Sequence, residues 1–218
     1  MNRLSPGVPS ETRKNVVAKR SGRRTQRERS ETTRAELLAA ARKLFARDGF
    51  GGTSLDAVVS RSGVTKGALY HHFDGKRDLF RAVFDEEQRR LATVVAAAYA
   101  RKRDPWTGFL AGCRAFLGEA LDPAVQQIVF LDARGVLGWE DMHQIETVHG
   151  LTLIKDGLLR LMAAGKIRRR PVDPLAHLIF GALTEAALFV ARSSDREAAR
   201  RQVVREFEGL LKTLGSGA

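Results

Sequence analysis

Apolar residues recur at steps of three and four along most of this chain, the spacing that places side chains on one face of an α-helix. One such stripe begins near Glu31, includes Leu37, Ala41 and Phe45, and ends at Asp48-Gly49. Glycine, proline and capping residues bound the other stripes. These predict further helices at about 55–62, 65–73, 76–101, 106–120, 124–133, 139–164, 174–191 and 196–214. No alternating strand pattern occurs, so we expect an all-α protein with about nine helices.

The segment from Gly63 to Phe73 predicts the turn and second helix of a helix-turn-helix, a compact unit that lays one short helix in the major groove of DNA. Gly63 ends the first helix, Val64 fills the angle between the helices, and Thr65 is placed to cap the second. Leu69 and Phe73, one turn apart, face the core. A helix of about two turns gains little stability by itself, so we expect the flanking segments to hold it.

This unit and its flanks resemble the N-terminal domain of TetR-family transcriptional regulators. The resemblance rests on Thr53-Ser54-Leu55, on the segment from Gly63 to Phe73, and on Lys76-Arg77-Asp78-Leu79-Phe80, in matching order and spacing. It covers about residues 31–84, although Val59 and Ser62 stand where the family more often has alanine. It implies a homodimer that binds a palindromic operator in double-stranded DNA and releases it when a small molecule enters the C-terminal domain.

The positions around the predicted turn carry groups suited to DNA. Hydroxyls and free N–H groups at a helix start, such as those of Thr53 and Ser54, suit a phosphate oxygen, and Lys66 can reach guanine or a phosphate. Small residues beside Lys66 permit close approach to base edges, and Lys76 resembles the phosphate-binding lysine of the family. The expected DNA-contacting residues are Thr53, Ser54, Thr65, Lys66, Gly67, Ala68, Tyr70, His71, His72 and Lys76.

Other interpretations of these residues stay open. Tyr70 can be a core aromatic, and His71 and His72 can be plain solvated residues at a helix end. A metal site formed by His71, His72 and Asp74 is disfavoured, because adjacent side chains on a helix point apart and would not converge on one ion.

Positive charge is concentrated at the N-terminus. Residues 1–30 contain nine Lys or Arg and two Glu, which gives +7 of the chain's net charge of +12. With little apolar material, this segment is expected to be a disordered basic arm, either a solvated leader or a contact to DNA phosphates. The expected organisation is therefore an arm at 1–30, a helix-turn-helix domain at 31–78, and a helical ligand-binding and dimerisation domain at 79–218.

The central helices of the second domain collect aromatic and soft side chains, the usual walls of a small-molecule site. Simple core packing explains any one of them equally well. Cys113 is the only cysteine, so no disulfide within the chain and no multi-cysteine metal site is possible. The expected pocket residues are Trp106, Phe109, Cys113, Phe116, Phe130, Arg134, Trp139, His143 and Glu185.

The last two predicted helices are candidates for a dimer interface. Residues 175–191 are apolar nearly all round, which indicates a buried helix, and the final helix carries an apolar stripe to match. Two helices from each subunit would form a four-helix interface, as the resemblance implies, whereas the alternative is the core of a monomer. The expected interface residues are Leu178, Ile179, Ala182, Leu183, Ala186, Phe189, Val203, Phe207 and Leu210.

The sequence also limits the class of protein. The apolar run at 175–191 contains Glu185 and is shorter than the ~20 residues needed to cross a bilayer. The N-terminus is polar and basic, without the apolar run of a signal peptide. We therefore expect a soluble, cytoplasmic protein with no membrane partner.

No enzyme motif is present that would compete with the DNA-binding signal. The chain has no glycine-rich phosphate loop, no nucleophile elbow and no paired metal ligands. We expect neither catalysis nor a cofactor. The leading hypothesis is a repressor that binds a DNA operator and responds to a small-molecule effector. The alternatives are an enzyme or small-molecule carrier with an incidental basic surface, and a DNA binder that needs no ligand.

Overall fold

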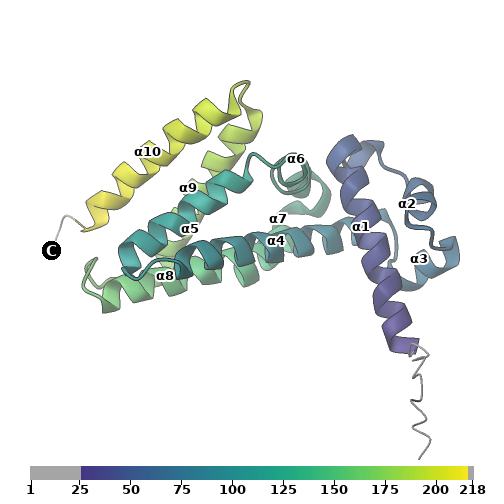
Figure 1. The fold of residues 1–218 in the computed structure, drawn as a ribbon, viewed down its shortest axis with the longest axis horizontal. Helices are drawn as coiled ribbons and strands as arrows, with labels where there is room; N and C mark the ends of the chain where they lie inside the picture. The colour runs from purple at the N-terminus through teal and green to yellow at the C-terminus, as the bar shows by residue number, and fades with distance from the viewer. Residues whose placement is uncertain (1–25, 216–218) are drawn as a thin grey trace, which may run out of the picture.

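The computed structural model describes residues 26–215 of the 218, and every regular element within this range is helical. The predicted all-α class is confirmed. In chain order, the elements are α1 (Gln26–Gly52), α2 (Leu55–Ser62), α3 (Lys66–His72), α4 (Lys76–Ala100), α5 (Pro105–Glu119), α6 (Pro123–Val125), the π-helical η1 (Gln126–Asp132), α7 (Ala133–Glu146), the π-helical η2 (Thr147–Leu151), α8 (Thr152–Ala163), α9 (Val172–Arg192) and α10 (Arg196–Gly215) (Figure 1).

Residues that the sequence marked as helix ends act as caps in the structure. The Ser54 hydroxyl accepts a hydrogen bond from the N–H of Ala57 at 3.1 Å, and the Thr65 hydroxyl accepts one from the N–H of Ala68 at 3.2 Å. Gly63 ends α2 with a φ of 70°, in the left-handed region that favours glycine. Together these caps fix the turn between α2 and α3.

α1 begins earlier than the sequence indicated. Residues 26–30, which we assigned to the basic arm, are helical, and residues 1–25 of that arm lie outside the described residues. The Arg27 guanidinium donates to the Glu31 carboxylate at 2.9 Å, one turn further on. Such pairs extend a helix beyond its buried part, where no apolar stripe marks it. At the other end, Gly49 interrupts the helix with a φ of 70°, at the expected place.

The chain from Pro123 to Ala163 is one helical run that bends once. Gly138, with φ of 75° and ψ of 175°, makes the bend, which agrees with the break expected before residue 139. The two π-helical segments were not expected, because a widened turn has no signature in the apolar pattern. They lie at contacts between distant parts of the chain: η1 packs against α1, and η2 packs against α4.

α4 connects the two ends of the molecule. It runs from the α1–α3 unit to the opposite end, where α5 returns alongside it (Figure 1). Two glycines of α5 permit this close packing. A Cβ at Gly108 would lie 3.2 Å from the carbonyl oxygen of Tyr99, and one at Gly112 would lie 3.3 Å from a methyl group of Val95. A larger residue at either position would separate the two helices.

α9 packs against α5, α8 and α10. Of the described helices, it alone is long and apolar enough to cross a membrane by length and composition. Its Leu175, Ile179, Leu183 and Val190 are buried against neighbouring helices. One side of α9 is therefore buried within the fold.

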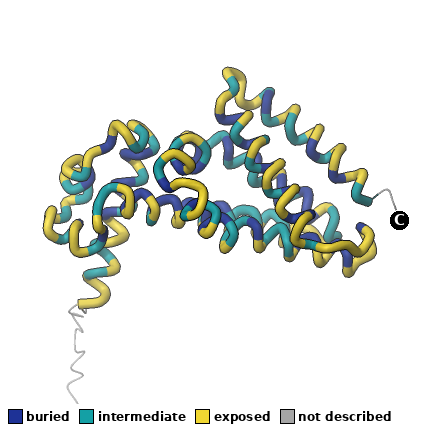
Figure 2. Tube along the Cα trace, turned by 180° about the vertical axis from the view of Figure 1, so that it is seen from behind, coloured by how far each residue is buried: buried dark blue, intermediate teal, exposed yellow. Residues whose placement is uncertain are grey.

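Two hydrophobic clusters hold the fold together. The first joins Phe45 and Leu69, inside the α1–α3 unit, to Ile128 of η1 and Ile145 of α7. The second lies between α5, α8, α9 and α10. Figure 2 shows the buried residues along the faces that the helices turn toward one another. The α1–α3 unit therefore shares its core with the middle of the chain, and the expected boundary at residue 78 falls inside α4.

Candidate DNA-binding surface and internal cavity

α3 is presented at one end of the molecule as a short helix with one buried face. Leu69 is fully buried and Phe73 is 3% exposed, and the Arg34 guanidinium of α1 lies 5.5 Å from the centre of the Phe73 ring. The opposite face carries Lys66 and Tyr70, and the Tyr70 side chain is 51% exposed. Tyr70 is therefore a surface residue and not a core aromatic.

Most of the expected DNA-contacting residues lie on this surface. His71 and His72 stand side by side at the end of α3 with their ring centres 5.3 Å apart, and burial, followed by the charges of His71 and Arg34, lowers the pKa of His72. Within residues 26–215, no group of three or more His, Cys, Asp or Glu is placed to hold a metal ion. The exposed residues of the set are Ser54, Thr65, Lys66, Gly67, Tyr70 and His71, and the half-buried ones are Ala68, His72 and Lys76.

Thr53 is the exception, and its expected contact with DNA is wrong for the side chain. It is 3% exposed, and its hydroxyl donates to the carbonyl oxygen of Gly49 at 2.9 Å. The left-handed Gly49 turns the end of α1 so that its carbonyl meets the Thr53 side chain. Thr53 therefore joins α1 to α2, and Ser54 is the hydroxyl residue that remains at the surface.

The two lysines of the surface have partners in the free protein. The Lys66 ammonium lies 2.8 Å from the Asp56 carboxylate of α2, and this hydrogen bond raises the pKa of Lys66. The Lys76 ammonium lies 3.4 Å from the carbonyl oxygen of Gly51 and 4.3 Å from the centre of the Phe50 ring. Exposed ion pairs contribute little stability, so a phosphate can replace Asp56 at small cost.

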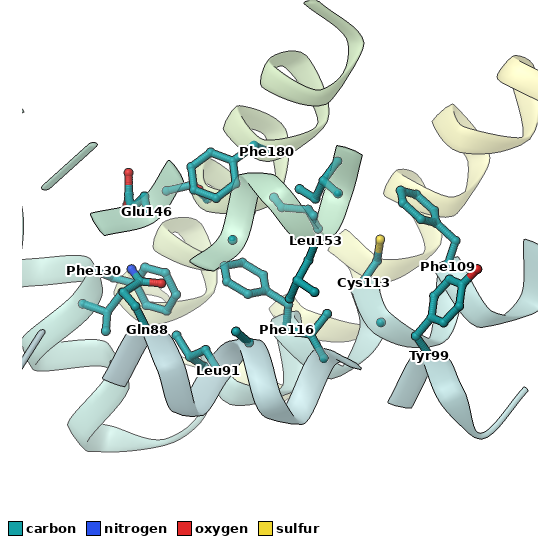
Figure 3. Close-up of a pocket in the computed structure, with 18 residues that line it drawn as sticks. Gln88, Leu91, Tyr99, Phe109, Cys113, Phe116, Phe130, Glu146, Leu153 and Phe180 are labelled. Carbon is teal, nitrogen blue, oxygen red and sulfur yellow. The ribbon is translucent and has the colours of Figure 1, made fainter. Parts of the chain in front are cut away.

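An apolar cavity lies in the second domain between α4, α5, η1, α7, η2, α8 and α9 (Figure 3). The cavity has a volume of about 70 Å³, several times what one water molecule needs. Four of the expected pocket residues, Phe109, Cys113, Phe116 and Phe130, form part of its wall. Burial raises the pKa of Cys113 to about 12, so this residue is a packed thiol and not a reactive thiolate.

The polar groups of the cavity were missed by the sequence. Gln88 and Glu146 lie at one end of it, each 6% exposed, and neither side chain hydrogen-bonds to another described residue (Figure 3). Burial raises the pKa of Glu146 to about 7, against the opposing effect of the Arg134 charge. A usable signal existed for Gln88, because it interrupts the apolar stripe between Phe84 and Leu91.

The remaining expected pocket residues do not line the cavity. Gly138 turns the chain so that Trp139 is 58% exposed, with its ring stacked on His143 at 4.7 Å and near Arg134 at 6.0 Å. Glu185 is exposed because it follows Thr184, which does face the cavity, and adjacent helical side chains point apart. Trp106 packs beside the second hydrophobic cluster. These five assignments, Trp106, Arg134, Trp139, His143 and Glu185, are corrected by the structure.

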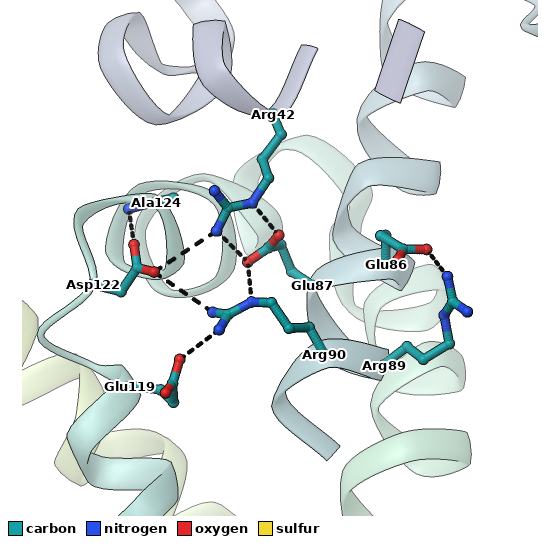
Figure 4. Close-up of polar contacts among 8 residues, drawn as sticks. All are labelled: Arg42, Glu86, Glu87, Arg89, Arg90, Glu119, Asp122 and Ala124. Atoms are coloured by element: carbon teal, nitrogen blue, oxygen red, sulfur yellow. Dashed lines mark hydrogen bonds and ion pairs between the residues drawn. The ribbon is translucent and has the colours of Figure 1, made fainter. Parts of the chain in front are cut away.

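A charged network lies between the cavity and the DNA-binding end (Figure 4). Glu87 of α4 is 1% exposed and accepts hydrogen bonds from Arg42 of α1, at 3.1 Å to Nη2, and from Arg90 of α4, at 3.3 Å. Arg90 also donates to Glu119 of α5 at 2.8 Å, and both arginines lie 3.7 Å from Asp122. The bond to Glu87 raises the pKa of Arg42. Glu87 thus joins α4 to α1 through Arg42, and Arg90 joins α4 to α5 through Glu119.

Comparison with known proteins identifies both halves of the chain. The model of bacterial regulatory proteins of the tetR family matches residues 37–83, and the model of the tetracyclin repressor-like C-terminal domain matches residues 106–214. The chain belongs to the TetR family. A TetR-family transcriptional regulator from Pectobacterium atrosepticum has a similar solved structure, with 38% identity and a TM-score of 0.77 over 88% of this chain and 97% of that one.

Two curated TetR-family relatives differ in how much they share. The TetC protein of transposon Tn10 from Escherichia coli is 22% identical over 87% of this chain and 95% of its own length. The transcriptional regulator UidR of Escherichia coli K12 is 35% identical, but over only 36% of this chain and 37% of its own. The short, more identical match shows that similarity is concentrated in part of the chain. The resemblance drawn from the sequence is confirmed, and this chain is a TetR-family DNA-binding transcriptional regulator.

The outer face of α9 and α10 in this TetR-family chain exposes apolar side chains. Leu178 is 72% exposed, Phe189 is 53% exposed and Leu210 is 65% exposed. Of the other expected interface residues, Ala182 is exposed, and Ala186 and Val203 are half-buried. Three expected interface residues are corrected, because Ile179, Leu183 and Phe207 are buried in the second cluster of their own subunit. Because α9 is apolar on nearly every side, the sequence could not show which of its sides is buried within the subunit.

Proposed function

We propose that this TetR-family regulator acts as a homodimeric repressor, which binds a palindromic operator through α3 and is released when a small molecule occupies the internal cavity. The single observation that carries this is the arrangement along α4. Its first turn follows the DNA-binding unit directly, Glu87 joins it to α1, and the next residue, Gln88, lines the cavity. A change of shape at the cavity therefore acts on the helix that positions α3.

The DNA contacts follow from the exposed face of α3. Lys66 and Gly67 lie in its first turn, the end of a recognition helix that contacts base edges, while Ser54 and Lys76 flank it at positions suited to phosphates. Phosphate contacts orient the protein and the few groove contacts specify the sequence. The relatives are regulators and not enzymes, and this role needs no catalytic group. A role at an operator requires the protein to be in the compartment that holds the DNA, the cytoplasm of a bacterium.

A dimer supplies the affinity that one short helix lacks. Two recognition helices bound to half-sites about one helical turn apart give a palindromic site. The exposed side chains of Leu178, Phe189 and Leu210 lie on the two last helices, away from the cavity, and suit a contact with the same surface of a second copy. An isologous contact of this kind matches the two-fold symmetry of a palindrome.

Release requires the effector to prefer the arrangement that does not fit DNA. A ligand shifts the equilibrium only by its difference in affinity for the two states. Because the wall of the cavity is mostly apolar, a ligand whose apolar part fills it in one state and not in the other supplies that difference.

The proposal is tested by footprinting the DNA upstream of the regulator's own gene, at ~150 mM salt and with random competitor DNA, because salt suppresses non-specific charge binding. We expect one protected palindrome. Tyr70→Phe and Lys76→Ala should weaken the protection, while Arg168→Ala, an exposed cation in the loop after α8, serves as the matched control. Binding that disappears with competitor, or that is unchanged in both variants, would contradict the proposal.

A further inference from the structure

The cavity adjoins an open groove at the end of α4 that is farthest from the DNA-binding unit. Val95, Tyr99 and Leu153 line both the cavity and the groove, so they form the wall between them. Tyr99 is half-buried, and its side chain makes no hydrogen bond to another described residue. A ligand that extends from the cavity into the groove would therefore pass between these three side chains.

The groove carries an excess of positive charge. Lys102 and Arg103, directly after α4, and Arg160, near the end of α8, line it together with one carboxylate, Asp156. None of these four forms an ion pair with a described residue. Arg160 lies 5.9 Å from the centre of the Tyr99 ring, at the wall of the cavity. Cations near helix C-termini also interact with the terminal carbonyls, but that effect does not require them to surround the opening of an apolar cavity.

The interior of the cavity suits the apolar part of a ligand, and the groove suits its charged part. Phenylalanine and aliphatic side chains line most of the cavity, where an unpaired charge would cost many kcal/mol to bury. From Gln88 to Tyr99, the cavity follows α4 for roughly 16 Å, at about 1.5 Å per residue. A volume of about 70 Å³ spread along that length makes the cavity narrow. A slender apolar body fits inside, and its charged group has to stay at the groove.

We propose that the effector is an amphipathic organic anion, whose slender apolar body occupies the cavity and whose carboxylate is held at the groove by Lys102, Arg103 and Arg160. This inference rests on the proposed function, because it takes the cavity as the effector site. It adds the chemical class of the effector, including the sign of its charge and the end of the cavity at which that charge lies.

The test is a calorimetric titration of the full-length protein with three probes of the same chain length, all below their micelle concentrations. These are decanoate, its neutral methyl ester, and the cationic decyltrimethylammonium. We expect decanoate to bind at least tenfold more tightly than either of the others. Equal or tighter binding of the ester or the cation, or no binding of decanoate, would overturn the proposal.

Variants locate the charge and the body. The double substitution Arg103→Glu with Arg160→Glu should weaken decanoate binding at least tenfold, whereas Arg168→Glu with Arg169→Glu, in the exposed loop outside the groove, should leave it unchanged. Ala92→Phe, which fills the cavity from α4, should abolish binding and so exclude adsorption at the surface. Circular dichroism confirms that each variant is folded. Unchanged affinity in the groove variant or in Ala92→Phe would overturn the proposal.

The operator footprint, measured without any probe, separates this inference from the proposed function. An intact footprint with no selective decanoate binding overturns the ligand class and leaves DNA binding standing. Selective decanoate binding without a footprint supports the ligand class and overturns the proposed function.

Discussion

The DNA-binding unit and the cavity are built in opposite ways. Every side chain of the candidate DNA surface comes from one stretch between residues 54 and 76, and its positions follow from two helix caps and one left-handed glycine. The cavity draws its wall from seven elements spread over about a hundred residues, from Gln88 to Thr184. In the first region the sequence places the groups directly, and in the second the packing of distant helices decides which groups face inward.

The two regions also treat polar groups differently. On the DNA surface, Lys66 and Tyr70 are exposed and can exchange water or Asp56 for DNA with little loss. In the cavity, Gln88 and Glu146 are buried beside apolar side chains, and burial raises the pKa of Glu146 to about 7. The DNA surface therefore has exposed polar groups, whereas the polar groups of the cavity are buried in a mostly apolar wall.

The largest effect is expected at the link between the two regions. Glu87→Gln should destabilise the protein by about 3 kcal/mol, because it removes the one buried carboxylate that both Arg42 and Arg90 contact and leaves them only the more exposed Asp122 and Glu119. The measurement is urea unfolding. Glu86→Gln, which breaks only the exposed pair with Arg89, is the matched control and should change the free energy of unfolding by less than about 1 kcal/mol. Equal effects of the two substitutions would show that the regions are not joined here.

The next prediction concerns the cost of the buried carboxyl. Because the pKa of Glu146 is about 7 in the folded protein and near 4.5 in the unfolded chain, the folded state holds a proton that unfolding releases between these values. The free energy of unfolding therefore falls as the pH rises from 4.5 to 7, because the folded state disfavours the ionised Glu146 carboxylate. Glu146→Gln should stabilise the protein by up to about 3 kcal/mol at pH 8 and have little effect at pH 4.5. Thermal unfolding at both pH values measures this, and a pH-independent difference would contradict it.

A smaller effect is expected at the outer face of α9. Leu178→Arg should raise the dissociation constant of the dimer at least tenfold, about 1.4 kcal/mol, because it places a charge at the centre of the proposed contact. Leu159→Arg, on a 50% exposed leucine of α8 outside this face, is the matched control. Sedimentation equilibrium distinguishes the two. A dimer unchanged by Leu178→Arg would place the interface elsewhere.

The smallest effects separate two neighbouring hydroxyls inside the DNA-binding unit. Thr53→Val and Ser54→Ala should each cost about 1 kcal/mol of stability, the first through a lost buried hydrogen bond and the second through a lost helix cap. Only Ser54→Ala should also weaken operator binding, since only that hydroxyl is exposed. Fluorescence anisotropy with operator DNA measures the difference. Equal losses of operator affinity in the two variants would contradict the assignment of Ser54 alone to the DNA surface.

These contrasts explain how far the sequence could lead. Ser54, Gly63 and Thr65 could be assigned as caps because capping depends on neighbours three residues away. The exposure of Trp139 could not be foreseen, because it depends on which way Gly138 turns the following helix. Glu87 gave no signal at all, since a buried carboxylate becomes intelligible only when Arg42, 45 residues earlier, is seen to reach it.

The first hydrophobic cluster has a consequence for how such regulators diversify. Because Phe45 of α1 and Ile128 of η1 belong to one core, the N-terminal unit is not a detachable module. Recombination with the second half of another regulator would pack two core surfaces against each other that did not evolve together. The hybrid would lose stability before it lost DNA specificity. New operator preferences are then easier to acquire by substitutions on the outer face of α3 than by exchanging whole units. Functional chimaeras would have to keep α1 together with the α6–η1 segment that completes its core.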